Sequence, residues 1–97
     1  GALTENYVLT ELVAQQINPV FWKSKQAAEV DFVCRIGQQI VPIEVKADEN
    51  VRSRSLAVYL DKYSPSVAVR LSAQNAGIKP PLYSEPLYLA SRLTDWF

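Results

Sequence analysis

The sequence predicts one domain of the mixed α/β class (α+β mixed), in which a central sheet is flanked by helices. Two neighbouring segments, residues 29–36 and 39–47, alternate polar and apolar side chains as half-buried strands do. Segments with helical spacing of apolar residues precede and follow this pair. The chain has 97 residues, 48% of them hydrophobic, which suffices for one core but not for two. We therefore expect residues 1–97 to form a single domain.

The first predicted element is an amphipathic helix from Leu3 to Ile17. Its apolar positions recur at helical spacing, and Asn18-Pro19 ends the pattern; these positions are Val8, Leu9, Leu12 and Val13. The next segment, Val20-Phe21-Trp22, is short and β-prone.

A β-hairpin is predicted from Glu29 to Ala47. Gly37 suits the first position of a two-residue type II′ turn, which pairs Ile36 with Gln39. Counting outward places Phe32 opposite Ile43, Asp31 opposite Glu44, Val30 opposite Val45, and Glu29 opposite Lys46. Alternation then assigns one face to Val30, Phe32, Cys34, Val41, Ile43 and Val45. The other face is expected to carry Glu29, Asp31, Glu44 and Lys46.

A second amphipathic helix is expected after residue 50, with Leu56, Tyr59, Leu60 and Tyr63 on one face. A β-branched strand over 66–71 follows, and then a loop over 72–81 that is rich in turn residues. Residues 83–90 favour a short strand interrupted at Pro86, and 91–97 a terminal helical turn. The predicted order is α-β-β-β-α-β with a short tail.

Composition limits the possible chemistry. The absence of histidine excludes Ser-His-Asp and Cys-His catalysis and every histidine-ligated metal site. Ten basic and ten acidic residues give zero net charge, so the basic field of a small DNA-binding module is missing. The single Cys34 permits no internal disulfide and fits a reducing cytoplasm as a buried apolar residue. No apolar run is long enough for a membrane span, and the lack of methionine suggests a fragment of a longer polypeptide.

Carboxylates gather in the predicted hairpin. If Asp31 and Glu44 are directly opposite, their charges repel by about 3 kcal/mol at a separation of about 5 Å. Lys46 offsets part of this repulsion, and a divalent cation with oxygen ligands, such as Mg²⁺, would offset more. Glu5 is a further acid at the apolar stripe of the first helix, where either a cation or the helix macrodipole would stabilise its charge.

These residues resemble a known motif. Asp31 followed by Glu44-Val45-Lys46, with an acid on a preceding helix, is similar to the motif of the PD-(D/E)XK nuclease superfamily. A longer ordered set resembles the uncharacterised nuclease-like domain at the C-terminus of many prokaryotic AAA+-type ATPases: Glu5-Asn6-Tyr7-Val8, Glu11-Leu12, Phe21-Trp22-Lys23-Ser24, Ala28-Glu29-Val30-Asp31-Phe32, Pro42-Ile43-Glu44-Val45-Lys46, Ser55-Leu56, Tyr63 and Pro81-Leu82-Tyr83. The sequence departs from the motif at Val30, where the superfamily has proline, and lacks an evident Gln-x-x-x-Tyr element on the second helix.

The resemblance implies a restriction-endonuclease-like αβββαβ core and metal-dependent cleavage of nucleic acid. Asp31, Glu44 and the main-chain carbonyl of Val45 would bind Mg²⁺ or Mn²⁺, and Glu5 would complete the set directly or through water. Lys46 would position or help deprotonate the attacking water and stabilise the charge on the phosphate. The resemblance also implies an ATPase domain earlier in the same polypeptide.

Other interpretations stay open. The chain could instead be a non-catalytic docking or dimerisation module, in which Glu29 and Lys46 form a cross-strand salt bridge and an apolar end with Trp96 and Phe97 meets missing chain or a second copy. A nucleic-acid binder without cleavage is a third possibility. Basic residues that could contact phosphates are Lys23, Lys25, Arg52 and Arg54. Aromatic residues that we expect in the core rather than stacked on bases are Trp22, Tyr59 and Tyr63.

Overall fold

The computed structural model of the chain describes residues 2–24, 29–46, 54–72, 77–79, 82–86 and 90–93. In chain order the elements are α1 (Ala2–Ala14), β1 (Val20–Lys23), β2 (Glu29–Ile36), β3 (Gln39–Lys46), α2 (Arg54–Tyr63), β4 (Ala68–Ser72), β5 (Gly77–Lys79) and β6 (Leu82–Pro86). A single helical turn follows at 90–93. The mixed α/β class and the αβββαβ order are confirmed, with two further strands after them.

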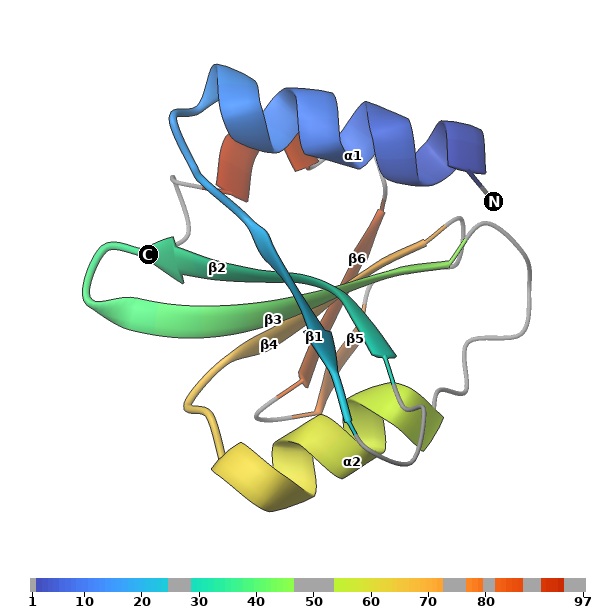
Figure 1. Ribbon diagram of the computed structural model, residues 1–97, viewed down its shortest axis with the longest axis vertical. Helices are drawn as coiled ribbons and strands as arrows, with labels where there is room; N and C mark the ends of the chain where they lie inside the picture. The colour runs from blue at the N-terminus through green and yellow to red at the C-terminus, as the bar shows by residue number, and fades with distance from the viewer. Residues whose placement is uncertain are drawn as a thin grey trace.

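The strands form one mixed sheet in the order β1-β2-β3-β4-β6-β5. Strands β1, β2 and β3 are antiparallel neighbours, whereas β4 runs parallel to both β3 and β6. Helix α2 lies in the connection from β3 to β4, as a parallel pair requires. Figure 1 shows α1 on one side of the sheet and α2 on the other. No described helix is long and apolar enough to cross a membrane.

Helix α1 ends earlier than the spacing predicts. The N–H of Ile17 donates to the carbonyl of Leu12 at 2.9 Å, and Gln16 takes a left-handed φ of 63°. This pattern, a Schellman cap, turns the chain so that Ile17 packs back into the core beside Leu12. The helix buries Val8 and Leu12 fully, but Leu9 is 39% and Val13 is 57% exposed. The buried stripe is therefore narrower than predicted.

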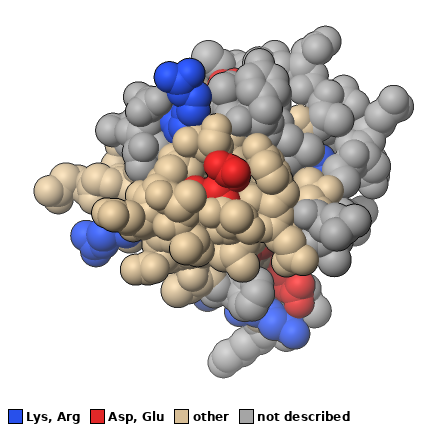
Figure 2. All heavy atoms as spheres, turned by 90° about the horizontal axis from the view of Figure 1, so that it is seen from above, with Lys and Arg blue, Asp and Glu red and all other residues tan. Residues whose placement is uncertain are grey.

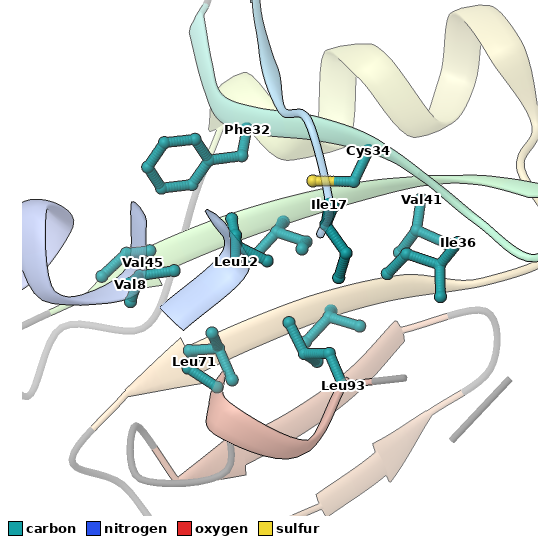
Figure 3. Packing of buried hydrophobic residues seen from close by; sticks show 13 residues of the cluster. Val8, Leu12, Ile17, Phe32, Cys34, Ile36, Val41, Val45, Leu71 and Leu93 are labelled. Atoms are coloured by element: carbon teal, nitrogen blue, oxygen red, sulfur yellow. The ribbon is translucent and has the colours of Figure 1, made fainter. Parts of the chain in front are cut away.

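The main core fills the side of the sheet that faces α1. Side chains from α1, β2, β3, β4 and the turn at 90–93 interdigitate there (Figure 3). They include Val8, Leu12, Ile17, Phe32, Cys34, Ile36, Val41, Ile43, Val45, Val69, Leu71, Ala90 and Leu93. Cys34 is 1% exposed, which confirms its predicted place as a buried apolar residue.

The predicted hairpin register is confirmed from Phe32↔Ile43 to Ile36↔Gln39. Beyond Phe32 the pairing of β2 with β1 shifts by one residue, because Val20 pairs with Val33 but Trp22 pairs with Val30. Such a bulge reverses the alternation of side chains. The predicted shared face is therefore wrong at Val30, which packs with Leu56 of α2 instead of with Phe32.

The later segments differ in detail from the prediction. The strand expected over 66–71 is observed as β4 at Ala68–Ser72. Strand β6 spans Leu82–Pro86, residues 87–89 of the predicted segment lie outside the described residues, and β5 lies where a loop was expected. Of the predicted terminal helical turn, residues 91–93 are helical and 94–97 lie outside the described residues.

Candidate active site

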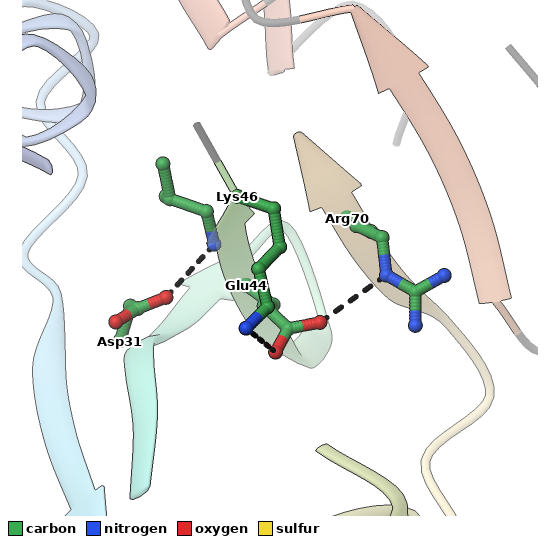
Figure 4. A network of polar contacts seen from close by, with 5 residues as sticks. Asp31, Glu44, Lys46 and Arg70 are labelled. Atoms are coloured by element: carbon green, nitrogen blue, oxygen red, sulfur yellow. Dashed lines mark hydrogen bonds and ion pairs between the residues drawn. The ribbon is translucent and has the colours of Figure 1, made fainter. Parts of the chain in front are cut away.

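Asp31 lies where β2 leaves its ladder with β3. The paired residues end at Phe32 and Ile43, and the next backbone N–H of β3 that points toward β2 belongs to Val45. That N–H donates to Oδ2 of Asp31 at 2.8 Å, as Figure 4 shows. The Asp31 carboxylate thus replaces a backbone acceptor, and the bulge places it at the end of the hairpin.

The backbone of Val45 supplies an oxygen at the same place. In an antiparallel ladder the N–H and C=O of every second residue point toward the same neighbouring strand. Val45 follows Val41 and Ile43 in that series, so its carbonyl faces the part of β2 that has left the ladder. A carboxylate and a carbonyl oxygen are therefore available side by side.

Glu44 has a partner that the sequence analysis missed. It is a buried acid, 6% exposed, on the central strand β3. The parallel register of β3 and β4 places Arg70 beside it, and Nε of Arg70 donates to Oε2 of Glu44 at 3.2 Å. The expected repulsion between Asp31 and Glu44 is thus resolved without a direct pair, because each carboxylate has its own donor (Figure 4). A charged residue inside an otherwise apolar strand was the signal for Arg70.

Lys46 lies close to the other oxygen of the Glu44 carboxylate. Its Nζ is 4.0 Å from Oε1 of Glu44, and a third of its side chain is exposed. The cross-strand salt bridge suggested between Glu29 and Lys46 is wrong, because Glu29 pairs with Lys23 of β1 at 3.5 Å. The amine of Lys46 is consequently close to Glu44 and accessible to solvent.

A pocket of about 420 Å³ opens beside Asp31. Its described lining consists of Glu5, Trp22, Lys23, Glu29, Val30 and Asp31. The fold therefore brings Glu5 of α1 and Asp31 of β2 to one pocket, with Glu5 exposed and not turned into the core as the stripe predicted. Within the described ranges no three Asp, Glu, Cys or His side chains are grouped to share one ion, so these acids do not form a three-carboxylate shell.

The predicted phosphate-contacting residues are placed only in part. Lys23 is two-thirds exposed and borders the pocket beside Asp31. Arg54 is the first residue of α2, and its side chain is not described. Lys25 and Arg52 lie outside the described residues, as do Trp96 and Phe97.

The aromatic residues Trp22, Tyr59 and Tyr63 form one cluster, and Trp22 also lines the pocket beside Asp31. The ring of Trp22 meets Tyr59 and Tyr63 edge-on, with centroids 5.2 and 6.0 Å away. Tyr59 is 5% exposed, which confirms the core prediction for it, whereas Tyr63 is 50% exposed. Burial raises the pKa of the Tyr59 hydroxyl, and the nearby Tyr63 raises it further, so this hydroxyl stays protonated.

Comparisons with known proteins give a family match and nothing closer. A family model described as "Domain of unknown function (DUF4143)" matches residues 1–83. Neither a curated protein nor a solved structure shows significant similarity to the chain.

Proposed function

The chain belongs to the family of the domain of unknown function DUF4143, and we propose that it is a phosphodiesterase that cuts nucleic acid with Mg²⁺ or Mn²⁺. One observation carries the proposal: at the end of the hairpin, the Asp31 carboxylate reaches the Val45 backbone while Lys46 lies 4.0 Å from Glu44. Acids and an accessible lysine at one strand end suit metal-assisted attack of water on a phosphate.

The donor set fits a hard divalent cation. Asp31 and Glu44 offer carboxylate oxygens and Val45 a carbonyl oxygen, which are the ligands that Mg²⁺ prefers. Glu5, on the same pocket as Asp31, would join through water. A bound cation would supply an activated water and neutralise charge on the phosphate.

The chain's own residues would divide the remaining work. Asp31 would hold its oxygen in place through the hydrogen bond from Val45. Lys46 would hold the attacking water and stabilise the negative charge that develops on the phosphate. Arg70 would fix Glu44 from the β4 side and balance part of its charge inside the protein.

The charge balance indicates weak binding of nucleic acid by this chain alone. Its net charge is zero, and Lys23, the described basic residue at the pocket, is paired with Glu29. Neutral surfaces release few counterions from a phosphate backbone, so the affinity depends on additional contacts. We infer that an ATPase domain of the same polypeptide supplies them in the cytoplasm.

Cleavage assays with matched variants test the proposal. The chain is incubated with DNA and with RNA in Mn²⁺. The cleavage rate is expected to fall at least about a hundredfold in Lys46→Ala, because the negative charge that develops on the phosphate in the transition state loses the lysine ammonium that stabilises it. Asp31→Asn is expected to abolish cleavage yet keep its melting temperature, since the amide oxygen still accepts from Val45. Asp31→Ala removes the acceptor as well and should lose about 1–3 kcal/mol of stability.

The control for these variants is Asp61→Asn, which changes an exposed acid on α2. It is expected to leave both cleavage and stability unchanged. Cleavage that persists in Lys46→Ala and Asp31→Asn would remove these residues from the mechanism and end the proposal.

A second candidate function, docking or dimerisation without catalysis, is favoured by the outer face of α1. Tyr7 is 42%, Leu9 39% and Val13 57% exposed. Figure 2 shows that uncharged side chains dominate the described part of this face, around one acidic side chain. Such a face suits a second copy of the chain. Light scattering tests this: a dimer that Val13→Asp dissociates, in a protein that cuts nothing, would replace the nuclease proposal.

A further inference from the structure

Arg70 uses only part of its guanidinium group to bind Glu44. Its Nε donates to Oε2 of Glu44 at 3.2 Å, and this is the only hydrogen bond of the Arg70 side chain within the described residues. The two terminal nitrogens point away from Glu44, as Figure 4 shows. Because a guanidinium has five N–H donors in a planar fork, most of its donors remain available to another acceptor.

The terminal nitrogens of Arg70 are open to solvent. The Arg70 side chain is 15% exposed, although the Glu44 side chain beside it is only 8% exposed. Within the part of the chain that the structure describes, a buried side-chain nitrogen or oxygen without a hydrogen bond occurs only at Gln39. The terminal nitrogens of Arg70 make no hydrogen bond and are not among these buried atoms, so a ligand can reach them.

The charges around Arg70 favour an anionic ligand. Glu44 lies between two cations, because Nζ of Lys46 is 4.0 Å from its other carboxylate oxygen. One carboxylate cannot balance both, so positive charge is in excess within this group. Asp31 bonds to the backbone of Val45 and makes no described ion pair with either cation.

The sheet places a neutral donor beside Arg70. Strands β4 and β6 are parallel, and their register pairs Arg70 with Ser84. Paired residues of neighbouring strands point to the same face of a sheet, so Ser84 lies on the face that carries Arg70 and Glu44. Ser84 is partly exposed, and its hydroxyl has no hydrogen-bond partner among the described residues. Free arginine N–H groups beside a free hydroxyl are donors that phosphate oxygens accept.

We propose that the terminal nitrogens of Arg70 bind a phosphate group of the nucleic-acid backbone while its Nε holds Glu44, and that Ser84 donates a further hydrogen bond to that phosphate. The inference rests on the proposed nuclease function and adds to it the residues that hold the substrate backbone. The planar fork of an arginine suits two oxygens of one phosphate, and the ion pair with Glu44 orients it before the substrate binds. Arg70 thus supplies one of the phosphate contacts that a chain of zero net charge otherwise lacks.

Binding is measured by fluorescence anisotropy at low salt in EDTA, so that no cleavage occurs. The probe is a short single-stranded DNA oligonucleotide. Arg70 is tested in a Glu44→Gln background, because there its removal leaves no uncompensated buried charge. Glu44→Gln is expected to bind the oligonucleotide more tightly than the unaltered chain, since Arg70 loses the acid that shares its charge. Adding Arg70→Gln should then weaken binding about tenfold, the size expected for hydrogen bonds from a charged donor.

The salt dependence of binding separates a phosphate contact from a structural role. Adding Arg70→Gln should reduce the slope of log affinity against log salt concentration by about 0.7, the contribution of one contact to a single strand. Ser84→Ala should weaken binding by about two- to threefold without changing this slope, because its hydroxyl is neutral. The control is Arg35→Gln, which makes the same change of charge at an exposed position of β2. It should leave the affinity and the slope nearly unchanged.

Equal affinity and equal salt dependence with and without Arg70→Gln overturn the proposal. An equal loss in Arg35→Gln also overturns it, because binding would then follow the net charge alone. If inorganic phosphate displaces the oligonucleotide at the same concentration of phosphate groups, the site takes free phosphate and the backbone contact is wrong. Because EDTA excludes catalysis, these outcomes are separate from a failure of the cleavage assay. A chain that binds through Arg70 but cuts nothing would refute the nuclease function and keep the phosphate site.

Discussion

The two sides of the sheet differ in what they bury. On the α1 side, a continuous cluster of aliphatic side chains with Phe32 and Cys34 fills the space. On the α2 side, the buried cluster is small and centres on Val30, Leu56 and Tyr59. Strand β3 serves both sides, because Ile43 and Val45 point to the α1 cluster and the intervening Glu44 points the other way, to Arg70.

The residues that stabilise the fold therefore differ from those that could carry chemistry. Apolar burial on the α1 side supplies the main driving force for folding. A buried ion pair such as Glu44–Arg70 contributes little net stability, because desolvation of both charges offsets their attraction. The pocket beside Asp31 borders this smaller cluster at Trp22 and Val30 and also reaches Glu5 of α1. The acids and the lysine of the candidate site therefore lie outside the aliphatic core that stabilises the fold.

The largest expected effect is in the α1 core. Leu12→Ala removes a fully buried side chain and should reduce the free energy of unfolding by about 2–5 kcal/mol, measured by urea denaturation. Leu9→Ala, on an exposed position of the same helix, should have a much smaller effect. Equal losses in the two variants would contradict the assignment of the α1 side as the stabilising core.

Breaking the ion pair of the α2 side should have the next largest effect. Arg70→Gln leaves the buried Glu44 with Lys46 as its remaining ion-pair partner, at 4.0 Å, and we expect a loss of up to about 3 kcal/mol. Adding Glu44→Gln removes the uncompensated charge and should recover much of this loss. If Glu44 also binds a cation, Mn²⁺ should raise the melting temperature of Arg70→Gln more than that of the unaltered chain.

A double-mutant cycle from the same denaturation curves measures the coupling. If the effects of Arg70→Gln and Glu44→Gln simply add, the two side chains do not interact in solution, and the contrast between the two sides of the sheet is weaker than the structure indicates.

Local patterns were enough to predict much of the fold. The Gly37 turn fixes the register of the hairpin, and the structure confirms Phe32 opposite Ile43. The position of Val30 could not be predicted in this way, because the bulge arises from the pairing of β2 with β1. Alternation within one strand carries no information on a neighbour that shifts its register.

The site was predictable to a similar extent. Asp31, Glu44 and Lys46 do gather at one end of the hairpin, although not on one flat face. Arg70 comes from β4, and its contact with Glu44 depends on the parallel register that the α2 crossover creates. Spacing along the chain does not reveal such a contact, since 26 positions separate the two residues. The catalytic roles stay predictions.

The smallest expected effect compares one buried weak acid on each side, Cys34 and Tyr59. Burial raises the pKa of Cys34 from 9.0 to about 12, and burial also raises that of Tyr59. Below the ordinary value of the thiol, folded and unfolded chains are both protonated and Cys34 adds no pH dependence. Between the two values only the unfolded chain ionises, so stability falls by up to about 1.4 kcal/mol per pH unit. Urea midpoints above about pH 9 should therefore decline less steeply in Cys34→Ala. Parallel declines would contradict a raised pKa of the Cys34 thiol in the folded chain and would leave the alkaline loss of stability to other groups, such as Tyr59.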